Sequence, residues 1–276
     1  MKIAVLITCF NRKSKTIRCL KSLFDTNFGF EVYLVDDGST DGTTEAIKRT
    51  FPNVNIIQGT GNLFWSRGMS LAWKQASNTK NYDFYLWLND DVCLYEFCLK
   101  ELLECSLIYK DLAIITGIIE SEDKSRILYG GYDINKKMIV PDGTIQSVRN
   151  LNGNVVLIPR LVYLKLGNFD LTFHHDLGDL DYGFQAIKKN ITVLTTRLPI
   201  AFGTYNSISR LRLNNSTIYE RFKRLYSPLG NPPLINFYFR KKHYGFFNAT
   251  IYWLYLHFLN IISDKINSFL FKNKYS

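Results

Sequence analysis

Asn89, Asp90 and Asp91 directly follow an apolar run, residues 84–88, and bring an amide and two carboxylates together. Bulky side chains without Gly or Pro predict that this run is a buried strand. On an extended backbone Asn89 and Asp91 would share a face. Oxygen ligands spaced this way suit a hard cation such as Mg²⁺ or Mn²⁺, with phosphate oxygens completing the shell. The alternative interpretation is an Asn-Asp turn that only ends the strand.

The elements that must position these residues alternate between strand and helix. Strands are predicted at residues 3–7, 31–35, 54–58 and 84–88, and helices at 15–24, 44–50 and 64–76. Short connections between them imply an α/β fold with a mostly parallel, doubly wound central sheet flanked by helices. Since the carboxyl ends of parallel strands cluster, three polar loops should converge on one edge of the sheet. These loops are residues 8–12, 36–43 and 89–91.

Charge is unevenly placed along the 276 residues. The net charge is +10, and residues 201–276 hold 11 Lys and Arg against only Glu220 and Asp264, a net charge of +9. A basic segment that is also rich in aromatic residues could meet nucleic acid, an anionic membrane surface or a phosphorylated substrate. The 46% hydrophobic content supports a substantial core in the rest of the chain.

The five cysteines form no CxxC pair, so buried free thiols in a reducing compartment are expected. No small-residue cleavage site follows the apolar residues 3–7, which argues against a signal peptide. The longest apolar run, residues 251–262, falls short of the roughly 20 residues of a spanning helix. We therefore expect a cytoplasmic protein, either free or peripheral on the inner face of the cell membrane.

Four motifs, in this order, resemble those of the family 2 glycosyltransferases, in particular the rhamnosyltransferase-like, surface-polysaccharide type. They are Thr8-Cys9-Phe10-Asn11-Arg12, the segment 35–43 (VDDGSTDGT), Asn89-Asp90-Asp91 as a DxD-type motif, and Gly178-Asp179-Leu180-Asp181 as an acidic EDxD-type segment. The resemblance covers roughly residues 3–205. No GxGxxG or P-loop follows the first strand, which weakens the dehydrogenase and P-loop interpretations.

The resemblance implies a GT-A catalytic domain over residues 1–205. Residues 1–92 would be its nucleotide-sugar-binding half and residues 93–205 its acceptor half, followed by a basic, aromatic, helical region at 206–276. The implied activity is metal-dependent, inverting transfer of one sugar from a UDP- or dTDP-linked donor. The acceptor would be a glycan, either free or linked to a lipid, and the reaction would belong to the synthesis of a cell-surface polysaccharide. The QxxRW motif of processive synthases is absent.

The resemblance also implies roles for individual residues. Asp91, with Asn89 or Asp90, would hold Mn²⁺ or Mg²⁺ on the donor diphosphate, although the family often has Asp where Asn89 stands. Asp179 would be the general base, with Asp181 and then Asp176 as the alternatives; one of these acids could instead cap a helix starting near Tyr182. The nucleotide-binding set would be Thr8, Phe10, Asn11, Arg12, Asp36, Asp37, Asn62, Arg67 and Asp90. The acceptor side would hold Asn154, His174 and His175.

Two questions remain open after the resemblance. The apolar residues from 251 to 269 recur at helical spacing, and their helical region could pack on the catalytic domain, join a homodimer or dock at a membrane. Two rival functions also remain: a sugar-nucleotide nucleotidyltransferase, and a non-catalytic nucleic-acid-binding protein suggested by the basic C-terminal region. Acidic loops at the sheet edge would repel a phosphate backbone, so we expect no nucleic-acid partner.

Overall fold

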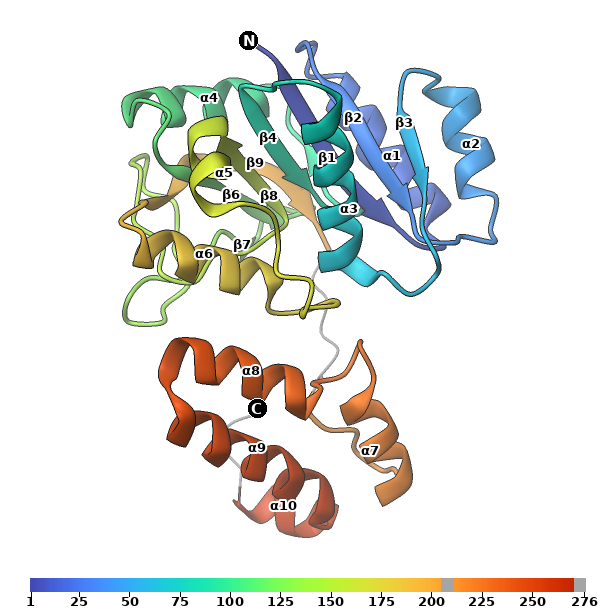
Figure 1. Cartoon of the computed structure of the whole chain (residues 1–276), viewed down its shortest axis with the longest axis vertical. Helices are drawn as coiled ribbons and strands as arrows, with labels where there is room; N and C mark the ends of the chain where they lie inside the picture. Colours follow the sequence, from blue (N-terminus) through green and yellow to red (C-terminus); the bar gives the residue numbers. More distant parts are fainter. Residues whose placement is uncertain (205–210, 271–276) are drawn as a thin grey trace. The chain divides into compact units, whose positions relative to one another are not determined.

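The computed structural model describes residues 1–204 and 211–270. The chain divides into two compact units, Met1–Tyr205 and Asn206–Ser276 (Figure 1). The first unit holds the central sheet and the candidate site residues, and the second is helical.

A nine-stranded sheet, counted over the described residues, forms the middle layer of the first unit. The strand order is β3-β2-β1-β4-β8-β6-β9-β5, and β7 pairs with β6. The strands are β1 (Ile3–Cys9), β2 (Glu31–Asp36), β3 (Asn55–Gln58), β4 (Phe84–Leu88), β5 (Cys93–Leu94), β6 (Ile114–Ser121), β7 (Ile127–Tyr129), β8 (Val155–Pro159) and β9 (Val193–Gly203).

The prediction of a mostly parallel sheet is right only for the first half of the unit. Strands β1 to β4 pair in parallel with one another, as do β6 and β9. Strand β8, however, runs antiparallel between β4 and β6, and β5 and β7 are also antiparallel to their partners. The sheet is therefore mixed, because the chain after β4 does not continue the strand–helix alternation that parallel pairing requires.

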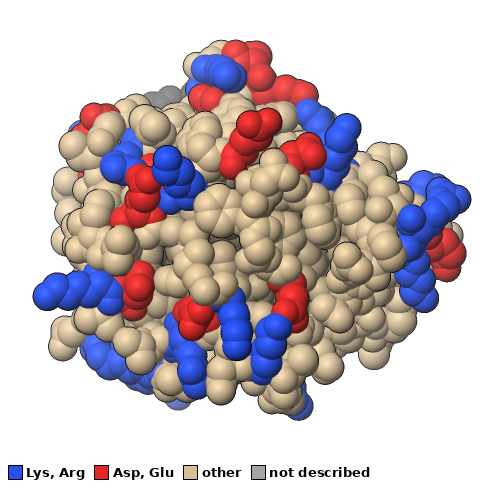
Figure 2. Space-filling view, turned by 90° about the horizontal axis from the view of Figure 1, so that it is seen from above, with Lys and Arg blue, Asp and Glu red and all other residues tan. Residues whose placement is uncertain are grey.

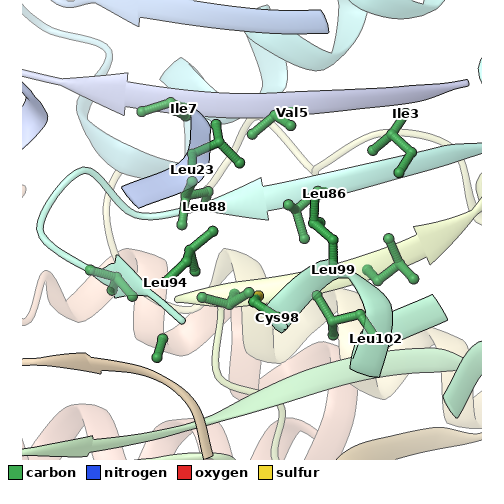
Figure 3. Close-up of a cluster of buried hydrophobic side chains, with 14 of the residues drawn as sticks. Ile3, Val5, Ile7, Leu23, Leu86, Leu88, Leu94, Cys98, Leu99 and Leu102 are labelled. Atoms are coloured by element: carbon green, nitrogen blue, oxygen red, sulfur yellow. The ribbon is translucent and has the colours of Figure 1, made fainter. Parts of the chain in front are cut away.

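Helices cover both faces of this sheet, as expected (Figure 1). One face carries α1 (Lys13–Phe24), α2 (Thr43–Thr50) and α4 (Cys98–Ile108), and the other carries α3 (Phe64–Thr79), α5 (Arg160–Leu166) and α6 (Gly178–Lys188). Alternation along β1 builds both cores, because Ile3, Val5 and Ile7 face the first set and Ala4 and Leu6 the second. Figure 3 shows the first core, where Leu23 and Leu99 pack on the sheet.

The strands and helices predicted up to residue 88 are all present, with ends shifted by a few residues. The third helix runs three residues beyond the predicted end, to Thr79. Two of the three indoles on this side, Trp73 and Trp87, are fully buried in an aromatic cluster with Tyr182 and Phe169. This cluster fixes α3 and α6 on the sheet beneath the candidate site.

The second unit consists of α7 (Ile218–Tyr226), α8 (Pro233–Tyr244), α9 (Phe246–Ile261) and α10 (Asp264–Leu270) in its described part. A capping box at Thr217 and Glu220 starts α7. Gly245, at φ 90°, separates α8 from α9. The apolar residues that recur at helical spacing between residues 251 and 269 are divided between two helices, α9 and α10, because the backbone at Ile262 is extended. Within 1–204 and 211–270, no helix is long and apolar enough to cross a membrane.

Candidate active site

Arg12 contacts both acidic side chains that follow β4. Its Nη1 lies 3.1 Å from Oδ1 of Asp90 and 3.0 Å from Oδ2 of Asp91. Thr16, one helical turn further along α1, places its hydroxyl 3.4 Å from the other oxygen of Asp90. The loop after β1 and the loop after β4 therefore meet, as expected for neighbouring parallel strands.

The backbone after β4 is a turn, not an extension of the strand, since the amide of Val92 donates to the carbonyl of Asn89 at 3.3 Å. The argument that Asn89 and Asp91 share a face of an extended chain is therefore wrong. Asp90 and Asp91 both meet Arg12, whereas Asn89 points elsewhere. Its Oδ1 accepts a 2.6 Å hydrogen bond from Nε1 of Trp65, and its amide donates to Oδ1 of Asn154.

Asp90 is almost completely buried, and this burial raises the pKa of its carboxyl to about 6. The guanidinium of Arg12 acts against this shift, and the negative charge of Asp91 adds to it. Arg12 itself is less than half exposed at its side chain. Arg12 is thus the cation that compensates the charge of this acidic pair.

Asp36 and Asp37 hold their own loops in place. Asp36 accepts hydrogen bonds from the amide of Ser39, at 2.9 Å, and from the hydroxyl of Thr44. Asp37 accepts from three backbone amides of the turn that leads into α3: Gly61 at 2.8 Å, Leu63 at 2.9 Å and Phe64 at 2.9 Å. Both carboxylates are buried, so they fix the shape of this edge of the sheet.

The loop after β1 is tied to the loop after β2. Asn11, at φ 50°, accepts from the amide of Thr40 at 2.7 Å and donates its own amide to Ser39 at 2.9 Å. Thr8 packs so closely on Gly68 of α3 that a Cβ at Gly68 would collide with its hydroxyl. Phe10 and Asn62 are exposed.

Residues 171–175 pack along the start of α3. Nε of Arg67 donates to the carbonyl of Leu171 at 2.9 Å, and Ser66 bonds to the carbonyls of His174 at 2.9 Å and His175 at 3.1 Å. Burial, with a smaller effect from Arg67, lowers the pKa of His174. This histidine pair therefore lies against the start of α3.

Asp179 lies in the first turn of α6, which begins at Gly178 and not near Tyr182 as predicted. Its Oδ2 accepts from the amide of Gly153 at 2.9 Å and its Oδ1 from the amide of Leu180 at 2.8 Å. Burial raises the pKa of this carboxyl. Asp181 is fully buried and accepts from Gln185 at 2.7 Å. Asp179 is thus the acid that combines fixed orientation with partial exposure.

Gly153 joins Asp179 to the turn after β4. A Cβ at Gly153 would lie 2.6 Å from the ring of Trp65 and 3.0 Å from the Cβ of Asp179, so only glycine fits. Trp65 in turn bonds to Asn89, the residue before Asp90. The structure therefore brings the acidic pair and Asp179 to adjoining places, connected by Asn89, Trp65 and Gly153.

Three residues outside the predicted site set contribute to this arrangement: Thr16, Trp65 and Gly153. Thr16 follows Arg12 by four residues, and this spacing places the two side chains on one face of a helix. The spacing could therefore have predicted that Thr16 lies near Arg12. Trp65 lies in the same segment as the predicted nucleotide-binding residues Asn62 and Arg67. From the sequence alone, however, a tryptophan there could equally be a core residue. Gly153 lies in the segment Asn152-Gly153-Asn154, through which the family resemblance continues, but the side chains that constrain it are distant in the chain.

Asp90 and Asp91 fit a divalent cation as a small donor set. Mg²⁺ and Mn²⁺ are commonly held by one or two carboxylates together with substrate phosphates. Among residues 1–204 and 211–270 no group of three or more His, Cys, Asp or Glu side chains is arranged to hold a metal. A cation here would rest on these two carboxylates and on the ligands that a substrate brings.

Comparison with known proteins decides the family. The model of the family described as "Glycosyl transferase family 2" matches residues 4–155, more than half of the chain. The chain belongs to glycosyl transferase family 2. The predicted resemblance is confirmed, and this chain is a glycosyltransferase. A search of curated proteins finds no match.

Solved structures show the same fold as this family 2 glycosyltransferase. TarS residues 1–349 from S. aureus, in complex with UDP-GlcNAc, has a TM-score of 0.60 at 16% identity, over 99% of this chain and 76% of that one. The mannosyltransferase PcManGT from Pyrobaculum calidifontis, in complex with GDP-Man and Mn²⁺, has a TM-score of 0.57 at 14% identity, over 90% and 73%. These likenesses support the GT-A fold.

Membership of family 2 sets aside the nucleotidyltransferase and the nucleic-acid-binding interpretations. Figure 2 shows one face of the molecule, over which basic and acidic side chains are interspersed without a large field of one sign. A cavity of about 700 Å³ lies beside the first residues of β9, lined by Ile134, Arg149 and Asn190 among others. None of the predicted site residues lines this cavity.

Proposed function

We propose that this glycosyltransferase is metal-dependent and inverting, and that it transfers a single sugar from a UDP- or dTDP-linked donor. The acceptor is a glycan, lipid-linked in the version we favour, in the synthesis of a cell-surface polysaccharide. The protein would then work as a peripheral enzyme on the inner face of the cell membrane, where such an acceptor is held. The observation that carries the proposal is that Arg12 meets Asp90 and Asp91 in a turn that Trp65 and Gly153 connect to Asp179.

The donor would bind over the loops that end β1, β2 and β4. In this proposal Asp91, with Asp90 beside it, holds Mn²⁺ or Mg²⁺, and Asn89 contributes through its position in the turn. The ion supplies charge neutralisation on the departing nucleoside diphosphate when it is bound. Arg12 and Arg67 are the cations available to the phosphates. Thr8, Phe10, Asn11, Asp36, Asp37 and Asn62 surround the nucleoside.

Asp179 would be the general base. It takes the proton of the acceptor hydroxyl as that oxygen forms a bond to the anomeric carbon of the donor. The bond from this carbon to the diphosphate breaks, and its electron pair leaves with the diphosphate, so the configuration inverts. The raised pKa of Asp179 favours this role, because a general base works best when its pKa approaches the working pH. Asn154, His174 and His175 would face the acceptor.

A donor screen tests the proposal directly. Purified protein is incubated with UDP-, dTDP- and GDP-linked sugars, with Mn²⁺ and with a chelator, and released nucleoside diphosphate is measured. We expect release from one nucleotide class only, dependent on the metal. Release that is unaffected by the chelator would contradict the metal requirement, and release from none of the donors would contradict the donor class.

A further inference from the structure

Helix α9 carries sixteen residues, Phe246–Ile261, and none of them is Asp, Glu, Lys or Arg. Its inner side packs against α7 and α8, with Ala249, Leu256 and Leu259 buried. A helix of this composition would usually be buried all round in a globular domain. The state of its outer side therefore needs an explanation.

Five large apolar side chains line the outer side of α9, and we name them the outer stripe: Phe247, Ile251, Leu254, Phe258 and Ile261. Each is between 48% and 82% exposed. They follow one another at intervals of four, three, four and three residues, which places them in one row along the helix. A contiguous exposed apolar row marks an interaction surface rather than scattered surface residues.

We infer that the outer stripe of α9 docks on an anionic lipid bilayer. Charge complementarity selects this partner. Lys241 and Lys242 lie in the last turn of α8, just before α9, and Lys265 follows it in α10. Residues 201–276 together carry a net charge of +9. Cations at both ends of an apolar row are attracted to anionic headgroups while the apolar side chains enter the acyl boundary.

The length of α9 determines how it would lie. Sixteen residues span about 24 Å, and a spanning helix needs about 20 residues. The helix would therefore lie in the plane of the interface, with the outer stripe facing the acyl chains. Lys side chains near its ends can extend toward the headgroups while their stems cover apolar surface.

A second copy of this chain fits the outer stripe less well. The spacing of the stripe corresponds to two heptads, fewer than the three to four that identify a coiled coil. Residues of α9 beside the stripe carry no opposite charges that could fix a register, because the helix has no charged residue. Two units with a net charge of +9 would also repel each other, whereas an anionic bilayer attracts both.

This inference rests on the peripheral location in the proposed function, but its test needs no sugar transfer. Flotation with vesicles of phosphatidylcholine, with and without phosphatidylglycerol, is compared for the full chain and for the double variant Phe247→Ser, Leu254→Gln. We expect binding only with phosphatidylglycerol, weakening as salt rises. The variant should bind roughly tenfold more weakly or worse, because two buried apolar side chains are lost.

A matched control removes two exposed apolar side chains from helices of the first unit: Leu107→Ser with Leu164→Gln. This control should bind vesicles like the unaltered chain. Circular dichroism and donor hydrolysis without vesicles are measured for both double variants. Unchanged values show that both are folded, so a loss of vesicle binding then reports the surface itself.

A fluorescent label locates the contact. All five native cysteines are buried, so a single introduced cysteine can be labelled selectively. An environment-sensitive probe on Ile251→Cys should shift to the blue when phosphatidylglycerol vesicles are added. The same probe on Tyr219→Cys, an exposed position on α7, should not shift.

Three results would overturn the inference: no vesicle binding by the unaltered chain, equal binding by the stripe variant, or a blue shift at Tyr219→Cys alone. A dimer that the stripe variant converts to monomer, in a chain that ignores vesicles, would assign the stripe to a second copy. Donor hydrolysis separates the two proposals. If the unaltered chain binds vesicles but hydrolyses no donor, the proposed function is contradicted and the inference about the lipid surface still stands.

Discussion

Trp65 donates its indole hydrogen to Oδ1 of Asn89 across 2.6 Å, and so ties helix α3 to the turn that carries the acidic pair. The same ring lies against Gly153, whose amide donates to Asp179. The proposed metal-binding turn and the proposed base are therefore held by one side chain. A disturbance at this ring should reach both.

Gly153→Ala tests this connection. The added methyl would lie 2.6 Å from the ring of Trp65, so the ring or the Asp179 turn must move. We expect a loss of about 1–3 kcal/mol in the free energy of unfolding, measured by urea denaturation. Transfer activity should fall roughly a hundredfold, because small misplacements of catalytic groups are costly. Gly29→Ala, where nothing lies within 4 Å of the new methyl, is the control and should change neither quantity.

Asp179→Asn should retain donor binding and lose transfer. The amide keeps the size of the side chain but cannot take the acceptor proton, and loss of a general base typically costs about 10²–10⁴ in rate. Donor affinity is measured by calorimetry and turnover by product release. Asp181→Asn serves as the comparison: its buried contact with Gln185 predicts a loss of stability in place of a specific loss of rate. Normal turnover in Asp179→Asn with an inactive, folded Asp181→Asn would move the base to Asp181.

Removal of Arg12 should strengthen Mn²⁺ binding in the absence of donor. Its guanidinium occupies the oxygens of Asp90 and Asp91 that the ion would use. In Arg12→Gln we expect a roughly tenfold higher Mn²⁺ affinity, the equivalent of about 1.4 kcal/mol, measured from the paramagnetic resonance signal of free Mn²⁺.

Arg18→Gln is the matched control, since Arg18 lies on the same helix but pairs with Glu122. It should leave Mn²⁺ affinity unchanged. Asp91→Ala should bind neither Mn²⁺ nor donor in the presence of Mn²⁺, while its unfolding stays cooperative. Weaker Mn²⁺ binding in Arg12→Gln, or wild-type Mn²⁺ binding in Asp91→Ala, would contradict the assignment of the metal to this pair.

Asp90 should make stability depend on pH in an unusual direction. Its pKa in the folded protein is about 6, against an ordinary value of 3.8. Between these values the folded protein holds a proton that the unfolded chain has released, so the free energy of unfolding falls as pH rises through this window. The contribution is present below about pH 4 and lost above about pH 6, and amounts to at most about 3 kcal/mol.

Asp90→Asn removes this titration. Urea denaturation at pH 4.5 and pH 7, for the unaltered chain and the variant, isolates the effect as a difference of differences. The variant should gain stability relative to the unaltered chain at pH 7 more than at pH 4.5. An equal gain at both pH values would mean that Asp90 titrates in its ordinary range.

The sequence predicted the first half of the fold well because alternating strands and helices leave a strong local pattern. Residues 3–88 show that pattern, and each predicted element is present. The direction of β8 had no such signal, because an antiparallel strand between β4 and β6 depends on pairing across long stretches of chain. The sheet is therefore mixed in the part of the chain after residue 88, where the alternation of strands and helices ends.

The candidate site residues came largely from the family resemblance, and their contacts could not be predicted. Arg12 and Asp91 do meet, and Asp179 is connected to the turn after β4 through Gly153 and Trp65. The turn at residues 89–92 was one of two interpretations, and the spacing argument chose the extended one. The connection of the turn after β4 to Asp179 through Trp65 and Gly153 could not be predicted, because packing between distant segments produces no periodic pattern in the sequence.

Asp37 receives three amides from the turn that opens α3, and this gives the donor edge a distinctive dynamic signature. The amides of Gly61, Leu63 and Phe64 share one acceptor group, so they should be released to solvent together and not one by one. In hydrogen exchange they would report a single opening event. The rate of that event would set how quickly this edge of the enzyme can reshape itself around a nucleotide.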